Sequence, residues 1–325
     1  NLQVMVGDLY NDPKYAGQRD SGFSIFYMAI NIGALFAPTA AVKIMEWAQQ
    51  NLGTSVNDSY HFAFAVACAS LILSIAIYYI FRGTFRHVEG GKKNAGSASA
   101  AVEELSPKDT NARILALCLV FAVVIFFWMA FHQNGLSLTY FADEFTAKSS
   151  TGVEGMAFNV WNLVCVIFIV YALFSLFQSK TGKGKAASVT MILLSLAFLF
   201  FQYDATKGEI VAVSAPIFQQ FNPFYVVALT PVSLAIFGSL AKKGKEPSAP
   251  RKIAYGMVVA GLAYCLMAVA SFGLPMPQTT VGPDGESVAV HVADVTPQLL
   301  IYTYLILTFA ELLLSPMGIS FVSNR

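Results

Sequence analysis

The chain has 325 residues, of which 56% are hydrophobic and 12% are charged, and its mean hydropathy is +0.60. A water-soluble domain of this length is much less apolar, so the composition predicts an all-α polytopic membrane protein. The formal net charge of +1 comes without a basic arm, and nucleic acid is therefore not expected as a partner.

Eight apolar runs are long enough to cross a bilayer, which takes about 20 helical residues. They centre on 22–42, 62–81, 114–141, 159–178, 186–203, 222–241, 253–274 and 298–321. We interpret residues 1–10 as the tail of a preceding helix. The chain starts at Asn1 and stops directly after an apolar run, so we expect a fragment.

Lysine and arginine are concentrated in every second connection, as the positive-inside rule requires of real spans. The basic connections carry Lys14 and Arg19; Arg82, Arg86, Lys92, Lys93, Lys108 and Arg113; Lys180, Lys183 and Lys185; and Lys242, Lys243, Lys245, Arg251 and Lys252. The alternate connections carry Lys148 and Lys207, and we expect Lys43 at a helix end. The basic connections are predicted to be cytoplasmic, so that the last span runs inward.

One long connection, residues 84–110, is rich in Gly, Ala and Ser and is charged, which is typical of a linker. We predict that this cytoplasmic linker separates the end of an N-terminal helix bundle, 1–83, from an incomplete C-terminal bundle, 111–325. The outer connection 273–298 is polar and contains Pro and Gly, and it predicts an extracytoplasmic loop or short hairpin.

Residues suited to catalysis or metal binding are scattered. The histidines lie at 61, 87, 132 and 291 without carboxylates at ligand spacing, and the four cysteines lie in apolar runs without CxxC spacing. We expect no enzyme, no metal site and no cofactor, and we expect the cysteines to be small buried side chains.

Polar residues within the spans are the candidate site residues. Asn31 is either an interhelical hydrogen-bonding group or a residue that faces a substrate. His132, Gln133 and Asn134 are consecutive and cannot all face lipid, which favours a polar cavity wall or a helix break at Gly135. His132 could titrate near neutral pH or stay neutral and hydrogen-bonded.

Asn222 precedes Pro223 and is interpreted either as a helix cap, with proline in the first helical position, or as a substrate ligand. Pro231, in the same span, leaves a backbone carbonyl unpaired and is expected to kink the helix.

Glu311 is the strongest candidate, because it is an acid within the uncharged apolar run 299–322. A buried carboxylate must pair with a cation or take up a proton, so Glu311 predicts transport or proton coupling. Ser315 is four residues further on and shares its helix face, and Pro316 permits a bend beside it.

Four segments in order together resemble the proton-dependent oligopeptide transporter family, a branch of the major facilitator superfamily. FSIFYMAINIGAL is similar to the signature of the family's fifth helix, and FWMAFHQNGLSLTYFADE to the seventh helix. FQQFNPFYVVALTPV is similar to the start of the eighth helix and FAELLLSPMGIS to the tenth. The resemblance implies a helix bundle of the major facilitator type, with residues 156–204 as an inserted helix pair. It also implies that this fragment lacks the family's first helices and its last two.

The resemblance implies a proton-coupled symporter that imports di- and tripeptides by alternating access, with protons as the coupling ion. Asn31 and Asn222 would hold the peptide backbone or termini, and Glu311 would bind its amino terminus and couple protons. The predicted substrate-binding residues are Asn31, Gln133, Asn134, Asn222, Glu311 and Ser315, and the predicted proton-coupling residues are Glu311 and His132. His132 stands where the family often has an acid.

The expected partners are a di- or tripeptide and the lipid bilayer, and the expected location is the bacterial cytoplasmic (inner) membrane. Two alternatives stay open: the same fold carrying another small solute, such as nitrate or a metabolite, and a membrane sensor that does not transport.

Overall fold

The computed structural model describes residues 2–10, 14, 19–86, 107–282 and 287–323. In these residues eight helices are long and apolar enough to cross a membrane, which confirms the eight predicted spans and a multi-pass membrane protein. The chain divides into two compact units: unit 1 is Asn1–Ile30 with Ala40–Ile125, and unit 2 is Asn31–Thr39 with Phe126–Arg325.

The described part of unit 1 is mainly helical, and a short turn joins its two longest helices. Its elements are α1 (Leu2–Leu9), most of α2 (Arg19–Leu52), α3 (Val56–Phe85) and the first part of α4 (Pro107–Phe131). Gly53 turns the chain between α2 and α3 at φ 63°, a conformation that favours glycine. The hydroxyl of Ser55 caps α3 by accepting the Asp58 amide at 3.0 Å.

Lys43 is not at a helix end, as the sequence had suggested, because α2 continues to Leu52. Its ammonium pairs with the Glu46 carboxylate at 2.9 Å, one turn further along the helix. Lys43 is therefore an exposed residue within a long helix that forms a local ion pair.

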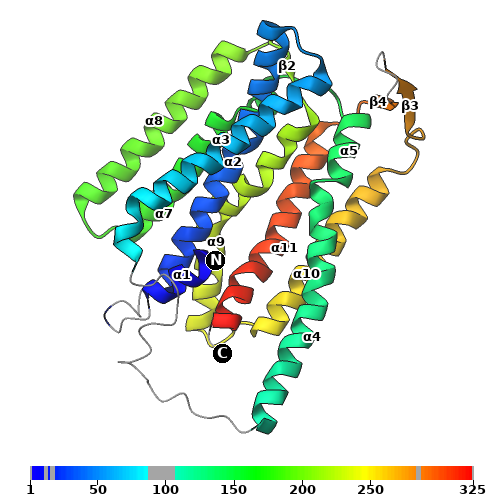
Figure 1. Ribbon diagram of the computed structural model, residues 1–325. Helices are drawn as coiled ribbons and strands as arrows, with labels where there is room; N and C mark the ends of the chain where they lie inside the picture. Colours follow the sequence, from blue (N-terminus) through cyan, green and yellow to red (C-terminus); the bar gives the residue numbers. More distant parts are fainter. Residues whose placement is uncertain (1, 11–13, 15–18, 87–106, 283–286, 324–325) are drawn as a thin grey trace. The chain divides into compact units, whose positions relative to one another are not determined.

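Unit 2 contains the remaining helices and two small sheets (Figure 1). In chain order they are η2 (His132–Asn134), α5 (Ser137–Glu144), β1 (Ser149–Ser150), α6 (Gly152–Met156), α7 (Val160–Gln178), α8 (Gly182–Thr206), β2 (Val211–Ala212), η3 (Ala215–Gln220), α9 (Phe221–Lys242), α10 (Ala249–Ala270), β3 (Gln278–Val281), β4 (Ser287–Val290) and α11 (Pro297–Ser323). Helix α11 packs against both α9 and α10, and α7 packs against both α8 and α9. Among the candidate spans α11 is the most deeply buried, so a polar group on it is enclosed by protein.

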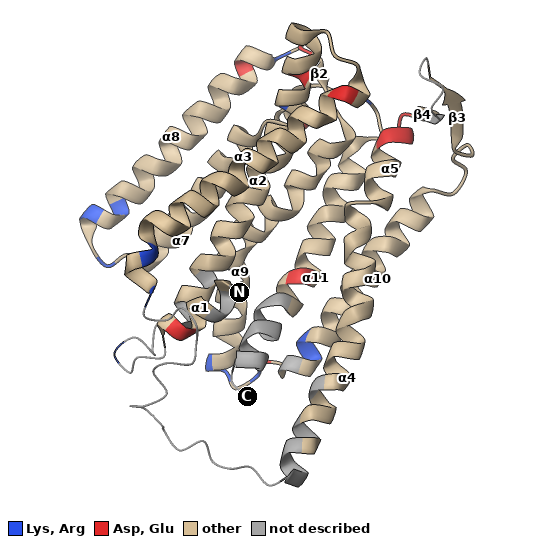
Figure 2. Ribbon diagram, in the orientation of Figure 1, with Lys and Arg blue, Asp and Glu red and all other residues tan. Residues whose placement is uncertain are grey.

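The connections within unit 2 alternate between its two ends. The α7–α8 and α9–α10 connections, which carry lysines, lie at one end of the helices, and the β1–β2 sheet and the β3–β4 hairpin lie at the other (Figure 2). Strands β3 and β4 pair antiparallel, with Gln278 opposite Val290 and Val281 opposite Ser287, so the outer connection forms the predicted hairpin. This alternation agrees with the predicted grouping of the basic connections at one end, and the assignment of that end to the cytoplasm stays a prediction.

The predicted linker 84–110 falls largely outside the described residues, since 87–106 are not among them. The domain division placed there therefore stays a prediction. The predicted inserted pair 156–204 corresponds mainly to α7 and α8, which pack together with the Ser188 hydroxyl 3.0 Å from that of Ser175. That this pair is an insertion also stays a prediction.

The expectation of buried cysteines is wrong for three of the four. Cys68, Cys118 and Cys265 are exposed, and Cys165 is partly buried. Hydropathy cannot separate a helix face that packs on protein from one that faces lipid, because both are apolar.

Candidate substrate and proton site

Glu311 lies inside α11 between Ala310 and Leu312 and is only 6% exposed. The α11 run from Pro297 to Leu314 has the apolar character of a span, so this carboxylate sits within a membrane-crossing helix. A carboxylate in such surroundings is stable only with hydrogen-bond donors, a cation or a proton.

The side chain of Asn222 reaches Glu311 from α9. Its amide nitrogen Nδ2 donates to Glu311 Oε2 at 2.8 Å and to Thr308 Oγ1 at 3.1 Å. An NH₂ group carries two donors, so one amide can serve both acceptors. The structure thus brings together two of the residues predicted from the sequence.

The interpretation of Asn222 as a helix cap is wrong. Gln220 is the cap residue of α9, and Asn222 is the second residue of the helix. The short helix η3 runs directly into α9, so the backbone is already helical before Asn222 and its amide is available to α11.

Thr308 is a member of this cluster that the sequence analysis missed. It is fully buried, accepts from Asn222, and donates to the carbonyl oxygen of Tyr304 at 2.8 Å. Residues three apart share a face of a helix, so the spacing between Thr308 and Glu311 was the available signal.

Pro231 leaves the Val227 carbonyl without its helical amide partner, as predicted. The Tyr171 hydroxyl of α7 donates to that carbonyl at 3.1 Å. Helix α9 therefore continues through Pro231 to Lys242 with the freed acceptor satisfied from a neighbouring helix.

The helix break predicted near Gly135 is present. Helix α4 ends at Phe131, residues His132–Asn134 form a 3₁₀ turn, and α5 begins at Ser137. The Gln133 side chain is engaged locally, accepting from the Ser137 hydroxyl at 2.6 Å. The exposed His132 ring lies 5.7 Å from that of Trp128, centroid to centroid. The substrate roles of Gln133 and Asn134, and the proton role of His132, stay predictions.

Asn31 is 7% exposed and belongs to the α2 segment that groups with unit 2. In this segment the Thr39 hydroxyl donates to Gln220 Oε1 at 3.1 Å, and the Phe36 ring lies 5.6 Å from that of Trp161. Asn31 is thus in the same unit as Glu311, and its role stays a prediction. Ser315 lies in α11, but its side chain is outside the described part of the chain.

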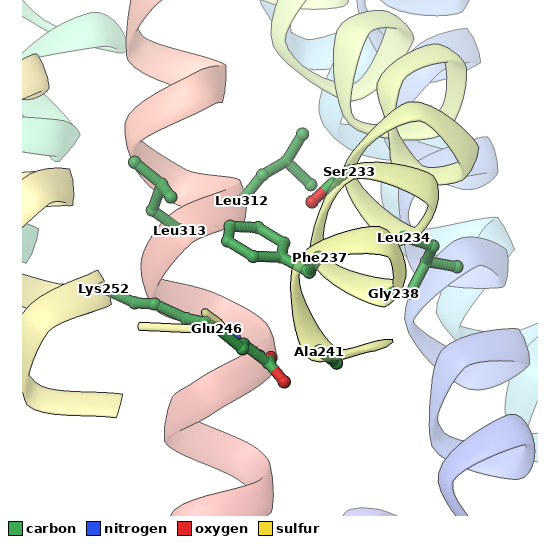
Figure 3. A pocket seen from close by; sticks show the side chains of 9 residues that line it. All are labelled: Ser233, Leu234, Phe237, Gly238, Ala241, Glu246, Lys252, Leu312 and Leu313. Carbon is green, nitrogen blue, oxygen red and sulfur yellow. The ribbon is translucent and has the colours of Figure 1, made fainter. Parts of the chain in front are cut away.

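A separate cavity of about 270 Å³ lies between α9, α10 and α11 (Figure 3). Its walls are mainly apolar, and Lys252 lies at its edge with 2% exposure, paired with Glu246. The Lys252 ammonium is 4.3 Å from the centroid of the Phe237 ring, a cation–π contact. Lys252 was expected in an exposed connection, but it lies in the first turn of α10.

Within the described residues no group of three or more His, Cys, Asp or Glu is arranged to hold a metal ion.

In a polytopic helix bundle, a buried, hydrogen-bonded acid within an enclosed span marks a candidate ion or substrate site. Residues 1–106 and 199–325 match the sequence model of the POT family. The chain belongs to the POT family. Its predicted fold class, a helix bundle of the major facilitator type, is confirmed.

Curated relatives align along almost the whole chain. The "Uncharacterized transporter YclF" of Bacillus subtilis is 28% identical over 98% of the chain and 57% of its own length. The "Dipeptide and tripeptide permease B" of Salmonella typhimurium is 26% identical over 94% of the chain and 54% of its own length. The "Di-/tripeptide transporter" of Lactococcus lactis is 24% identical over 98% of the chain. The chain spans between half and two thirds of the length of these relatives.

Solved structures also align along the chain. A crystal structure of a mutant peptide transporter POT in complex with alafosfalin is 26% identical, with a TM-score of 0.43 over 98% of this chain and 57% of the other. A POT family transporter in complex with a thioalcohol-conjugated peptide is 21% identical, with a TM-score of 0.45 over 98% and 59% of the two chains.

Proposed function

We propose that the protein is a proton-coupled symporter that imports di- and tripeptides by alternating access across a bacterial cytoplasmic membrane. The observation that carries the proposal is the buried Glu311 carboxylate, held by Asn222 of α9 inside the most enclosed span. Family membership supports a transporter, and the names of the Salmonella and Lactococcus relatives support a peptide as the solute.

The chemistry of Glu311 suits both ligands. A buried carboxyl group can take up a proton or pair with a cation, and the ammonium of a peptide amino terminus is a matching partner for its ionised form. Asn222 donates through an uncharged amide, so it can orient the carboxyl group without supplying a fixed positive charge. Proton and peptide therefore bias the same equilibrium between two transporter states.

The test is uptake of labelled dialanine into liposomes that hold the protein at its natural length, with and without an imposed inward proton gradient. We expect accumulation that needs the gradient and is competed by unlabelled dipeptides. Glu311→Gln keeps the hydrogen-bonding shape but cannot exchange a proton, so gradient-driven uptake should fall to the level of protein-free liposomes while peptide exchange persists.

The matched control is Glu209→Gln, an acid that is exposed in the connection after α8. This variant should accumulate dialanine as the unchanged protein does. Driven uptake that survives in Glu311→Gln would remove the proposed proton role. No dialanine uptake by folded protein, together with uptake of nitrate or another small solute, would assign the fold a different substrate.

A further inference from the structure

The break between α4 and α5 exposes backbone carbonyls that side chains then satisfy. Within the break the Gly135 amide bonds His132 O at 3.2 Å, and the Leu136 amide bonds Gln133 O at 3.3 Å. The regular helical ladder is interrupted here, and in a membrane every freed acceptor requires another donor.

Two tyrosines from other helices donate to carbonyls on either side of the break. The Tyr264 hydroxyl of α10 donates to Ala130 O at 2.8 Å, before the break. The Tyr304 hydroxyl of α11 donates to Asn134 O at 2.9 Å, at its far end. Tyr304 is only 1% exposed, so this contact is made deep within unit 2.

Tyr304 also lies on the helix face that carries the candidate site. Tyr304, Thr308 and Glu311 are spaced four and three residues apart, which places them in one row along α11. Thr308 donates to the Tyr304 carbonyl, and Asn222 bonds both Thr308 and Glu311. In the rotation of α11 about its axis that accompanies these contacts, the Tyr304 hydroxyl reaches Asn134 O.

We propose that Tyr304 is a positioning residue that links the state of the Glu311 carboxyl group to the break between α4 and α5. When Glu311 loses its contact with Asn222, α11 is no longer held in this rotation and the hydroxyl leaves the Asn134 carbonyl. The segment that begins α5 is then released. The proposal rests on Glu311 changing its partners during transport, which is part of the proposed function.

Tyr264 provides an internal comparison. It holds the same break from its other side, but it belongs to α10, and its hydroxyl bonds Ala130 rather than any residue of the Glu311 cluster. Loss of either hydroxyl removes one hydrogen bond that stabilises the segment between α4 and α5. A change at Glu311 should be transmitted only through Tyr304.

Amide hydrogen exchange of residues 132–138, measured on the protein at its natural length in lipid nanodiscs, tests this linkage. Tyr304→Phe and Tyr264→Phe should each raise local exchange about fivefold, the effect of losing one hydrogen bond. Glu311→Leu, which cannot accept from Asn222, should raise it severalfold. Adding Glu311→Leu to Tyr304→Phe should produce no further increase, whereas adding it to Tyr264→Phe should multiply the two effects.

Tyr302→Phe, an exposed position on the same helix, should leave exchange of the break unchanged. Independent effects of Tyr304→Phe and Glu311→Leu would overturn the proposal, as would a Glu311→Leu variant whose break exchanges like that of the unchanged protein. The cycle uses no peptide and no gradient, so it gives its answer even if dialanine is not the solute.

Discussion

At the scale of single residues, the polar contacts of unit 2 join helices that are otherwise apolar. Between transmembrane helices there is little hydrophobic driving force for association, and packing and hydrogen bonds decide which faces meet. The Asn222 amide joins α9 to α11 by donating hydrogen bonds to Thr308 and Glu311, which lie on one face of α11. The Thr308 hydroxyl both accepts the bond from Asn222 and donates one to the backbone of its own helix.

Thr308→Val should therefore lower the free energy of unfolding by about 1 kcal/mol, the cost of one interhelical hydrogen bond. The control is Thr303→Val, on the same helix and equally buried, whose hydroxyl bonds the Leu299 carbonyl of its own helix at 2.8 Å. That change should cost only a few tenths of a kcal/mol, because the carbonyl keeps its helical amide. Unfolding in mixed micelles with increasing SDS measures both, and equal costs would contradict the interhelical role of Thr308.

At the scale of elements, the sequence predicts the helices well and their irregularities in part. Runs of apolar residues are enough to locate eight spans, since each must satisfy its own backbone in lipid. Pro231 and the His132–Asn134 run also indicate where regular helical hydrogen bonds are lost. The donor that replaces each lost bond depends on which helices pack together. Tyr171, which donates to the Val227 carbonyl, is 56 residues away in the chain.

The pairing of Tyr171 with the carbonyl freed by Pro231 leads to a double-mutant prediction. Tyr171→Phe should cost about 1 kcal/mol in the unchanged protein, because the Val227 carbonyl loses its donor. In a Pro231→Ala background the same change should cost much less, since the alanine amide can bond Val227 O as in a regular helix. Comparison of the four proteins by unfolding in SDS mixtures gives the coupling, and additive costs would show that the hydroxyl acts elsewhere.

At the scale of the whole chain, charge predicts which connections share a side and polarity singles out two residues that the structure joins, but neither predicts the contacts around them. Glu311 and Asn222 stand out in sequence because each is polar within an apolar run, and the structure joins them. Lys252 was indistinguishable in sequence from its exposed neighbours. Its burial depends on the fold of the α9–α10 connection, where Gly244 turns the chain at φ 63° and Glu246 supplies the counter-charge.

The assignment of sides is tested by labelling single cysteines with a membrane-impermeant maleimide in a background without the four native cysteines. Lys180→Cys and Lys245→Cys are in the basic connections at one end of unit 2, and Lys148→Cys and Lys207→Cys are in the connections at the other end. We expect the second pair to react in intact cells and the first pair only after the membrane is opened, because the positive-inside rule places the basic connections in the cytoplasm. All four positions are exposed, so a lack of reaction reflects the membrane rather than burial in protein. Labelling of one member from each pair on the same side would require an even number of crossings between them, and the antiparallel order of α7 to α9 would then be wrong. Labelling of the first pair alone in intact cells would keep that order but invert the protein, placing the final span with Glu311 in the outward direction.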